Sequence, residues 1–504
     1  MTTRAKKILL FNPRSANSKY RIPNSILSIA SSIEGQWEWT LVDGNLESDP
    51  LQKLREFLLT GDYGFFGSTV MPGPQLKQAI PFTKHIKQEF PQVKTIWGGY
   101  FPSNHPQVVL ESGFVDVLVY GLGEESFPPL LEALHTGAAL NEIPNLIYPE
   151  NGEMVKTRKA DIPNPGKLPP LPYDKLDEFY PLEKYLGNTF LGNRTVAYHS
   201  SYGCPFTCSF CAVVPIFGAR WKGKPAQKIY EDICYLKQYY GADAIEFHDN
   251  NFFVSEKRTV EFAHLIEKEQ MQWWGEARID TMDKYTDESL QQVSDAGCRM
   301  IFFGAETGDD AVLQKMNKGG TQTGAQILRF AERLSHFNII PEYSFVLGTP
   351  FPTERQVWEQ IEKDIAFIKK VKAVNPQTEI IIYIYSPVPT TGSDLFDEVS
   401  SSGFLFPQKL EDWISPAWEN FDLRKNPLTP WLTPAMVNRI RNFEVVLNAQ
   451  YPTVSDVKLT GLQRKVMQGL SKWRYENSWY HWPLELRVLQ SKWLRYRQPE
   501  IEGM

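Results

Sequence analysis

The chain has few cysteines, no long hydrophobic run and little net charge, and each of these absences excludes a class of protein. Its 504 residues include five cysteines, an odd number that is not typical of a disulfide framework and favours a reducing compartment. No run of about 18 apolar residues occurs, so no membrane-spanning helix is expected. The apolar run from Ile8 to Phe11 is too short for the core of a secretory signal. These features predict a cytoplasmic location.

Acidic residues slightly outnumber basic ones, which gives a net charge of −6. A charge of this sign does not attract a phosphate backbone, so we expect no nucleic-acid partner. With 42% hydrophobic and 22% charged residues, the composition is that of a folded globular protein. The length is sufficient for about three domains.

Short apolar runs alternate with helix-length segments over residues 1–150, a pattern typical of a doubly wound parallel sheet covered by helices. Such sheets bind their ligands at the carboxyl ends of the strands, where glycines let a large ligand approach the backbone. We therefore predict a Rossmann-like ligand-binding domain. Its candidate ligand contacts follow the apolar runs: Ser68, Thr69, Gly98, Gly99, Gly121, Gly123 and Glu124.

A proline-rich segment at residues 151–194 is expected to be a linker, since prolines disfavour regular structure. Strand–helix alternation resumes over residues 195–400, with six candidate strands. Because a closed barrel needs eight such units, we predict an open, partial β/α barrel. Residues 401–504 lack clear strands and are rich in aromatic residues. They are predicted to form a helical cap on the barrel or, alternatively, a helix that contacts a lipid surface.

Three of the cysteines lie within eight residues, directly after a predicted strand. Cys204, Cys208 and Cys211 occupy one loop, where three thiolates can bind three irons of a cubane cluster and leave the fourth iron open. A zinc site completed by a histidine is the alternative, although structural zinc usually has four ligands in paired motifs; chance clustering is another. Cys234 and Cys298 lie in helix-like or core contexts and are expected to be small buried apolar residues.

The loop resembles the C-x3-C-x-aromatic-C motif of the radical S-adenosylmethionine (SAM) superfamily, with Phe210 at the aromatic position. Segments similar to the later strand ends of that fold follow in order: FHDNNFF at 247–253, GEARID at 275–280, FFGAETG at 302–308, SFVLGTP at 344–350 and YSPVPTTGSDLF at 385–396. The resemblance implies a 4Fe-4S cluster on Cys204, Cys208 and Cys211, whose open iron binds SAM. It also implies SAM contacts by Asp249, Asn250, Arg278, Glu306 and Gly348.

Two qualifications accompany this resemblance. Family members often carry an arginine before the Gly-Cys pair, whereas this chain has Tyr202, so we do not expect the contact that this arginine makes in the family. For Arg278 and Glu306, the alternative to a SAM contact is a structural ion pair inside the barrel.

The N-terminal region is similar to the cobalamin-binding domains that precede many radical SAM modules, through PQVKTIWGGYFPS at 91–103 and VDVLVYGLGEESF at 115–127. The resemblance implies that the glycines and Glu124 lie against the corrin and that Ser68 and Thr69 place hydroxyls below it. The D-x-H-x-x-G motif that supplies a cobalt-ligating histidine in corrinoid mutases is missing from the sequence. We therefore expect cobalamin in a base-off form without a protein histidine on cobalt.

Together these resemblances imply an enzyme that generates a 5′-deoxyadenosyl radical from SAM, with electrons from a donor such as flavodoxin or ferredoxin. A neighbouring cobalamin favours methylation of an unactivated carbon of a small molecule. The aromatic region after Phe404 hints at an apolar or flat substrate. The alternatives are an anaerobic oxidative cyclase similar to the magnesium-protoporphyrin monomethyl ester cyclases, another radical rearrangement, and a non-catalytic cobalamin-binding sensor.

Overall fold

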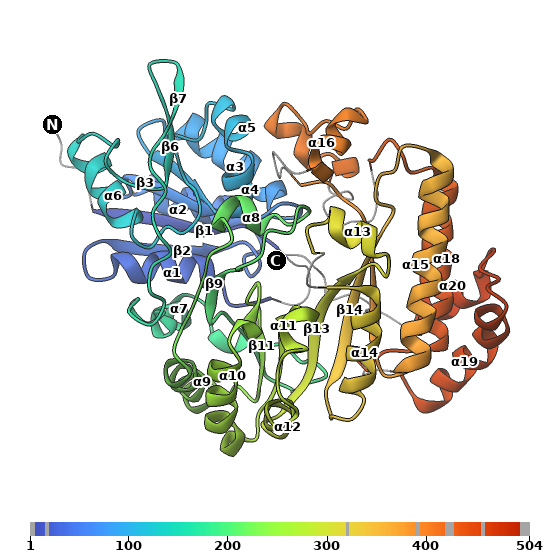
Figure 1. The fold of residues 1–504 in the computed structure, drawn as a ribbon. Helices are drawn as coiled ribbons and strands as arrows, with labels where there is room; N and C mark the ends of the chain where they lie inside the picture. Colours follow the sequence, from blue (N-terminus) through green and yellow to red (C-terminus); the bar gives the residue numbers. More distant parts are fainter. Residues whose placement is uncertain are drawn as a thin grey trace.

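The computed structural model describes residues 6–15, 20–318, 322–388, 394–418, 428–454 and 459–493. Two α/β units lie side by side and are followed by C-terminal helices (Figure 1). The first unit is built on a seven-stranded sheet and the second on a six-stranded sheet, and a small two-stranded sheet lies in the second unit. The predicted fold class is confirmed.

The N-terminal sheet has the strand order β2-β1-β3-β4-β5-β6-β7. Its first five strands are parallel, as predicted: β1 (Lys7–Asn12), β2 (Glu38–Asp43), β3 (Phe65–Thr69), β4 (Lys94–Gly98) and β5 (Val117–Val119). An antiparallel hairpin, β6 (Leu146–Glu150) and β7 (Glu153–Lys156), extends the sheet and makes it mixed. Sequence analysis did not predict this hairpin.

Helices cover both faces of this sheet because alternate residues of its central strands are buried on opposite sides. On β1, Ile8 and Leu10 belong to one hydrophobic cluster, whereas Leu9 and Phe11 belong to another. The covering helices are α1 (Asn24–Ile33), α2 (Pro50–Leu59), α3 (Leu76–Glu89), α4 (Tyr100–Asn104), α5 (Pro106–Glu111) and α6 (Phe127–Thr136).

The segment at residues 151–194 connects the two units but is not irregular throughout, contrary to expectation. It contains β7, helix α7 (Tyr173–Phe179) and the 3-10 turn η1 (Leu182–Tyr185). Helix α7 forms because the prolines stop before it and Leu176 is fully buried. Two tyrosine hydroxyls tie the segment to the N-terminal unit: Tyr180 donates to Glu47 and Tyr185 to Asp43, each at 2.7 Å.

The second unit is the predicted partial barrel of six parallel strands. Their order is β15-β14-β13-β12-β11-β8, with β8 (Thr195–Tyr198), β11 (Ala244–Phe247), β12 (Gln272–Ala277), β13 (Cys298–Glu306), β14 (Ile340–Leu347) and β15 (Glu379–Ile384). The helices between the strands are α9 (Ala226–Tyr240), α10 (Glu256–Ile266), α11 (Ile279–Met282), α12 (Asp287–Asp295), α13 (Asp310–Lys315), α14 (Gly324–Leu334) and α15 (Glu354–Val374), with the 3-10 turns η2 (Phe252–Val254) and η3 (Glu267–Glu269).

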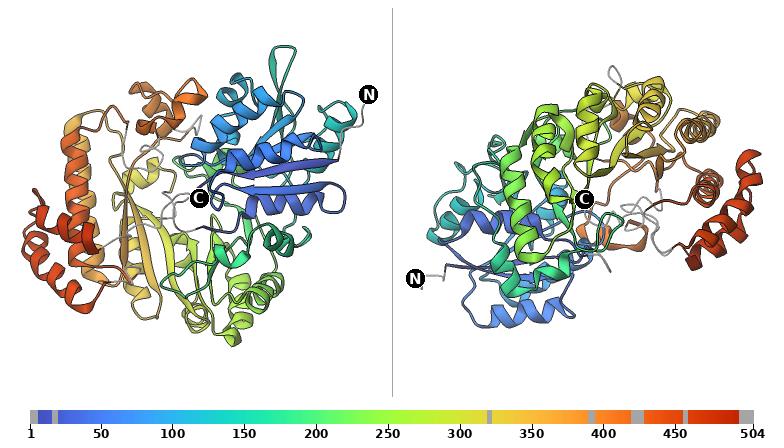
Figure 2. Two further views of the ribbon diagram at one scale, coloured as in Figure 1. Left: turned by 180° about the vertical axis from the view of Figure 1, so that it is seen from behind. Right: turned by 90° about the horizontal axis from the view of Figure 1, so that it is seen from below.

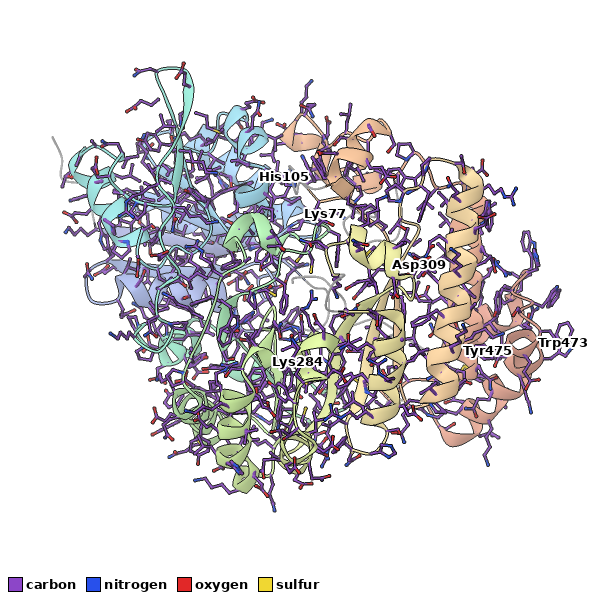
Figure 3. All side chains as sticks on the ribbon, in the orientation of Figure 1. Lys77, His105, Lys284, Asp309, Trp473 and Tyr475 are labelled. Carbon is purple, nitrogen blue, oxygen red and sulfur yellow. The ribbon has the colours of Figure 1, made fainter. Side chains whose placement is uncertain are left out.

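The region after residue 401, predicted as one cap, divides into two parts. The first, with η4 (Leu410–Ile414) after α16 (Asp394–Ser401), packs against the N-terminal unit. There the Trp413 ring lies 5.0 Å from that of Phe101 and 4.5 Å from that of His105, centroid to centroid; His105 is labelled in Figure 3. The second part, α18 (Pro434–Gln450), α19 (Gly461–Glu476) and α20 (Leu484–Trp493), packs outside α15.

Helices α18–α20 and the N-terminal unit lie at opposite ends of the molecule, with the partial barrel between them (Figure 2). Among the residues that the structure describes, no helix is both long and apolar enough to cross a membrane.

Candidate functional site

The three clustered cysteines lie on a loop held at its base by a short antiparallel hairpin. Strands β9 (Ser201–Gly203) and β10 (Trp221–Gly223) pair with Gly203 opposite Trp221. Gly203 directly precedes Cys204 and has a φ of +75°, and a Cβ there would lie 2.2 Å from the Arg220 carbonyl oxygen. Only glycine therefore fits the position where the chain enters the loop.

The end of helix α13 clamps the same loop from the other side. Ser209 donates its backbone N–H to the Met316 carbonyl and its hydroxyl to that of Lys315, both at 3.0 Å. The Asn317 amide donates to the carbonyl and the hydroxyl of Thr207, both at 2.7 Å. These hydrogen bonds hold the loop between Cys204 and Cys211 in place. Helix α8 (Val213–Phe217) follows it.

The thiols share one electrostatic environment. Burial, followed by the charge of Cys208, raises the pKa of Cys211 to about 12. Burial also raises the pKa of Cys204, with the charge of Cys208 acting in the same direction. Among the described residues, no three His, Cys, Asp or Glu side chains surround a single metal ion. The thiols would give up their protons on binding iron, as thiolate ligands must.

Arg278, a predicted SAM contact at the end of β12, lies at this loop. Its Nη1 is 3.1 Å from the Cys208 sulfur, and its guanidinium carbon is 3.9 Å from the Phe206 ring centroid. It also forms a bidentate pair with Asp280, at 2.9 Å and 2.8 Å. The structure therefore contains the ion pair that sequence analysis left as the alternative, together with a direct contact to a cysteine.

Glu306, the second predicted contact at a strand end, is also paired. Its carboxylate lies 2.7 Å from Lys318 Nζ, and both side chains are buried. Its φ of +63° is unusual for a residue other than glycine and coincides with a register shift between Gly304 and Glu306. Its charge contributes to the raised pKa of Cys211, and Lys318 Nζ lies 5.9 Å from the Phe210 ring centroid.

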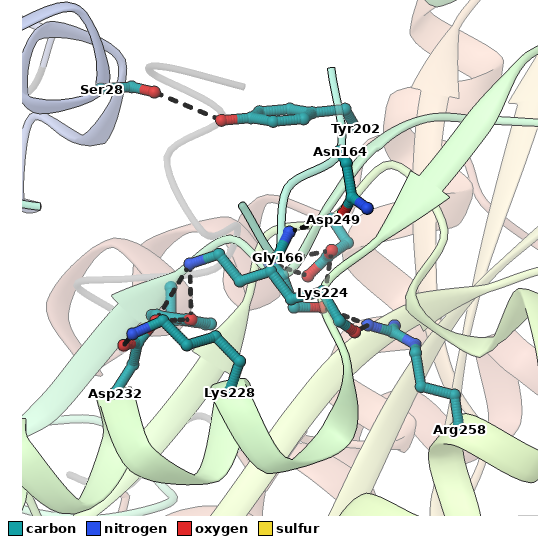
Figure 4. A network of polar contacts seen from close by, with 11 residues as sticks. Ser28, Asn164, Gly166, Tyr202, Lys224, Lys228, Asp232, Asp249 and Arg258 are labelled. Carbon is teal, nitrogen blue, oxygen red and sulfur yellow. Dashed lines mark hydrogen bonds and ion pairs between the residues drawn. The ribbon is translucent and has the colours of Figure 1, made fainter. Parts of the chain in front are cut away.

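Asp249, expected to contact SAM, holds the backbone that leads into the cysteine loop. Its carboxylate accepts hydrogen bonds from the Ser200 N–H at 3.0 Å, the Ser200 hydroxyl at 2.9 Å and the Ser201 hydroxyl. Burial raises its pKa, and the positive charge of Arg258 opposes that rise. Figure 4 shows this network, in which Arg258 also donates to the Ser200 hydroxyl at 3.1 Å. In this structure Asp249 positions the loop.

The two residues after Asp249 reach the site itself. Asn250, predicted as a SAM contact, accepts a hydrogen bond from the Tyr100 hydroxyl at 3.1 Å. Asn251 is fully buried, and its amide makes no hydrogen bond to another side chain or backbone group within the described residues. Its side chain interacts with the Cys204 thiol and lowers the pKa of that group, against the larger effect of burial. A buried amide without a partner beside a cluster ligand is the kind of group that a bound cofactor satisfies.

The predicted ligand contacts of the N-terminal unit lie at the carboxyl ends of its strands. Ser68 and Thr69 are buried at the end of β3, and Ser25 lies 3.2 Å from the Thr69 hydroxyl. Gly99, after β4, has a φ of +101°, and a Cβ there would lie 2.8 Å from the Val70 carbonyl. Gly98, in contrast, has only the Val119 carbonyl near it, at 3.6 Å. These positions form one edge of the sheet.

The remaining predicted contacts follow β5. Gly121 has a φ of +74°, and a Cβ on Gly123 would lie 2.6 Å from the Ile29 side chain. Glu124 is buried, and one of its oxygens accepts from Ser28 at 2.6 Å and from Tyr202 at 2.9 Å. Its other oxygen has no partner within the described residues.

Tyr202, which precedes the Gly203–Cys204 pair, links the two units. Its hydroxyl contacts Glu124 and, at 3.2 Å, Ser28, a pair visible in Figure 4. Together with the bond between Tyr100 and Asn250, this contact brings the strand ends of the N-terminal sheet against the cysteine loop. Asn104 adds a contact of 3.4 Å to the Ala212 carbonyl.

Comparison with known proteins explains this arrangement. The model of the Radical SAM superfamily matches residues 198–364, from β8 to α15, which include the three cysteines and all the strand ends described from Asp249 to Gly348. Residues 198–364 belong to the radical SAM superfamily. Membership implies a 4Fe-4S cluster and SAM, and the loop fits them: it offers three thiols, an arginine on one sulfur and the unpartnered Asn251 amide.

Relatives of known sequence include methyltransferases and a cyclase. An uncharacterized methyltransferase of Pyrococcus horikoshii is 27% identical over 72% of this chain and 78% of that protein. The anaerobic magnesium-protoporphyrin IX monomethyl ester cyclase of Synechocystis is 25% identical over 49% of each chain, so this radical SAM protein aligns with about half of that relative.

A solved structure shares the fold over nearly the whole chain. The radical SAM methyltransferase TsrM from Kitasatospora setae, with cobalamin and a 4Fe-4S cluster bound, superposes with a TM-score of 0.67 and 16% sequence identity. The superposition covers 97% of this radical SAM chain and 99% of that chain. At this identity the likeness establishes the fold.

Inside the radical SAM unit, charged side chains that sequence analysis did not single out line neighbouring strands. Arg21, from the N-terminal unit, contacts both Glu246 and His248 at the end of β11. Burial is the main cause that raises the pKa of Glu276 and of Glu342 to about 8. Arg21, Glu246 and Glu342 lie outside the motifs quoted above, although a charged residue within an apolar strand is the signal that could have found the two glutamates.

Three further predictions concern Gly348, the strand-end segment at 385–396 and the two cysteines outside the loop. Gly348 has a φ of +83°, and its carbonyl accepts from Trp431 Nε1 at 2.9 Å. Part of the expected strand-end segment at 385–396, residues 389–393, lies outside the described residues. Cys298 is fully buried as predicted, whereas Cys234 is partly exposed on α9, so its assignment to the core is wrong.

Proposed function

We propose that this radical SAM enzyme is a cobalamin-dependent methyltransferase that methylates an unactivated carbon of a small molecule. The observation that carries the proposal is the position of the N-terminal strand ends against the cysteine loop, through Tyr100 with Asn250 and Glu124 with Tyr202. A corrinoid at these strand ends and a SAM molecule on the cluster would therefore lie next to each other between the units. The fold shared with a cobalamin-containing methyltransferase supports this arrangement.

The cluster and SAM supply a 5′-deoxyadenosyl radical when they are bound, and cobalamin supplies a methyl group. The chain's part is to bind, orient and exclude water. Cys204, Cys208 and Cys211 would hold the cluster, and Arg278 would offset the negative charge of the thiolates next to it. We expect Asn250, Arg278, Glu306 and Gly348 to contact SAM, and Asp249 to act on it through the Ser200–Ser201 backbone.

The residues of the N-terminal unit fit a base-off cobalamin. Gly98 leaves open space above the backbone, so a large flat ligand can approach there. Ser68 and Thr69 offer hydroxyls at the end of β3. The free oxygen of Glu124 is a buried acceptor without a partner in the described residues, which a hydrogen-bond donor on the corrin side chains would satisfy.

The wall of the partial barrel suggests the character of the substrate. Trp274 lies on β12 with Glu276, and Phe302 on β13 is the register partner of both Glu276 and Glu342. Trp274 Nε1 donates to Glu342 at 3.1 Å. Because the pKa of each carboxyl is raised to about 8, both can donate hydrogen bonds at neutral pH. We therefore infer a substrate with a polar group as well as an apolar body, which modifies the purely apolar expectation.

The test is anaerobic reconstitution with iron, sulfide, SAM, cobalamin and a reductant, followed by mass analysis of cell extracts incubated with the enzyme. A methyltransferase yields a product heavier by one methylene unit, together with 5′-deoxyadenosine and S-adenosylhomocysteine. SAM with a deuterated methyl group must pass its label to the product. The variant with Cys204→Ala, Cys208→Ala and Cys211→Ala is the matched control, because it removes the thiols and leaves the N-terminal unit intact.

The second candidate is an oxidative cyclase, which the alignment with the Synechocystis enzyme favours. A cyclase removes hydrogen or inserts oxygen without adding a methylene unit, so the same mass analysis separates the two reactions. Flavodoxin or ferredoxin is the expected electron donor and should replace the chemical reductant in the assay, whichever of the two reactions the enzyme catalyses. A sensor without catalysis would bind cobalamin yet form no 5′-deoxyadenosine.

A further inference from the structure

Exposed apolar side chains concentrate on the last two described helices and on the segment that joins them. Among the described residues, 14 large hydrophobic side chains are exposed, and eight of them lie between residues 462 and 488. We call this set the Trp473 face; it consists of Leu462, Val466, Leu470, Trp473, Trp479, Trp482, Leu484 and Val488. A contiguous apolar surface on a folded protein usually marks an interaction site.

The helical spacing places half of these residues on one stripe. Leu462, Val466, Leu470 and Trp473 follow one another at intervals of four, four and three residues along α19, so they share a side of the helix. The opposite side, with Met467 and Ser471, is buried. Helix α19 packs against α18 and α20. The stripe is therefore an outward face and not part of the core.

The face lies at the edge of the molecule. Trp473 projects outward from the end opposite the N-terminal unit, whereas Tyr475 on the same helix turns inward (Figure 3). The Trp473 side chain is 59% exposed and that of Trp482 is 77% exposed. Neither the cysteine loop nor the N-terminal strand ends adjoin this face (Figures 1 and 2).

Exposed basic residues lie in the same segment as the Trp473 face. Residues 461–493 contain six lysines or arginines and two glutamates, whereas the whole chain carries a net charge of −6. Lys465, Lys472, Arg487 and Lys492 are exposed; Arg474 is buried and pairs with Glu485 at 2.6 Å. The positive charge is thus local and set against an acidic molecule.

We propose that the Trp473 face binds an anionic lipid surface and holds the enzyme at a membrane. Tryptophan prefers the headgroup level of a bilayer, and lysines and arginines beside an apolar face are attracted to anionic lipids. A second copy of the chain is a poorer occupant, because a two-fold contact through this face would bring the same basic residues together. The proposal is independent of the chemistry of the enzyme.

The experiment measures co-sedimentation of the intact, anaerobically reconstituted protein with lipid vesicles. Vesicles of phosphatidylcholine are compared with vesicles in which about one third of the lipid is phosphatidylglycerol. We expect the anionic vesicles to bind at least about tenfold more tightly than the neutral ones, with the difference decreasing at high salt. The variant with Trp473→Ala and Trp482→Ala should bind at least about tenfold more weakly than wild type to the anionic vesicles.

The control variant carries Leu59→Ala and Met154→Ala, which removes two exposed apolar side chains of the N-terminal unit. It should bind like wild type, and circular dichroism should show the same melting temperature for all three proteins. The proposal would be overturned if the wild-type protein did not bind anionic vesicles, or if the control variant lost as much binding as the variant with Trp473→Ala and Trp482→Ala. A dimer in light scattering that the Trp473→Ala and Trp482→Ala changes dissociate, without lipid binding, would assign the face to a second copy instead.

Discussion

Glu306 allows a ligand contact to be distinguished from a structural ion pair at a single residue. Removing one partner of a buried pair typically costs about 3–5 kcal/mol, but the Glu306→Gln change keeps size and hydrogen-bonding capacity. Lys318 would keep its bond to the Gly304 carbonyl at 2.5 Å. We expect the variant to retain its iron and its melting temperature and to form 5′-deoxyadenosine more slowly at limiting SAM.

Lys318→Gln is the matched control, since it breaks the same pair and leaves the carboxylate. If Glu306 binds SAM, saturating SAM restores much of the rate in Glu306→Gln, and Lys318→Gln shows no comparable dependence on SAM. Equal destabilisation of both variants with an unchanged SAM dependence would show that the pair is structural.

Asp364 predicts a pH dependence of stability. Its carboxyl is buried on α15 and accepts from Thr307 at 2.5 Å, and burial raises its pKa to about 7. Between about pH 4 and pH 7 the folded state therefore holds a proton that the unfolded state has lost. The contribution of Asp364 to the free energy of unfolding is complete below about pH 4 and disappears as the pH rises to about 7. The free energy of unfolding should fall by about 1.4 kcal/mol per pH unit in that interval because of this residue.

Asp364→Asn should remove that part of the slope, measured by urea unfolding at several pH values under anaerobic conditions. Asp161→Asn is the control, because the Asp161 side chain is 93% exposed and its loss should leave the slope unchanged. A slope that persists in Asp364→Asn would mean that another group is responsible.

The sequence identified the residues with a local signature and missed those that depend on distant contacts. Cys204, Arg278 and Glu306 lie in short motifs, and all are found at the loop. Tyr100 was not predicted because its partner Asn250 lies 150 residues away. Asn251 was missed because an asparagine after a strand is ordinary until its burial beside Cys204 is seen.

At the scale of elements, the β9–β10 hairpin is the base of the cysteine loop. A substitution of Gly203 tests whether this hairpin holds the loop in place. Gly203→Ala places a Cβ 2.2 Å from the Arg220 carbonyl at a φ of +75°, so the backbone must move. The cost should exceed about 1 kcal/mol, and most of the cluster iron should be lost on purification.

Gly218→Ala provides the comparison, because this glycine also has a positive φ, +62°, but a Cβ there meets no atom within 4 Å. It should keep nearly all of its iron, measured together with sulfide in both proteins. Similar iron contents in the two variants would mean that the hairpin does not determine the loop.

Strands were predictable as elements where apolar runs were long, as in β1 and β15. The β6–β7 hairpin was missed because the strand Glu-Met-Val-Lys is largely exposed and lacks an apolar pattern. Helix α7 was missed because it follows a proline-rich stretch, and its only fully buried side chain, Leu176, is buried by the packing of distant segments. Both elements are fixed by tertiary packing more than by local preference.

At the scale of the whole molecule, the strand ends of the N-terminal sheet contact the cysteine loop, and the sequence does not indicate this contact. The contact depends on side chains that are far apart in the sequence, among them Arg21, Tyr100 and Tyr202. The division of the C-terminal region was equally hidden, since Trp413 packs on the N-terminal unit and α18 packs on α15. Aromatic composition alone does not specify which surface a segment covers.

Cobalamin binding tests this juxtaposition, and Gly98 is the position to change. A side chain there has space within the protein, with its nearest neighbour, the Val119 carbonyl, at 3.6 Å from the Cβ. Gly98→Leu should therefore fold and keep its iron while filling the space that the corrin needs. We expect wild type to take up about one cobalamin and the variant to take up at least tenfold less at the same concentration.

The spin-resonance spectrum of bound cob(II)alamin tests the state of the cobalt. We expect no nitrogen hyperfine splitting from an axial ligand, because the chain lacks the histidine motif. The two histidines nearest the interface already have partners: His199 lies 3.3 Å from the Asn24 amide, and His248 contacts Arg21. The variant with His199→Ala and His248→Ala should give the same spectrum as wild type. A nitrogen splitting in wild type that this variant removes would contradict the base-off assignment, and unchanged uptake by Gly98→Leu would place the cofactor elsewhere.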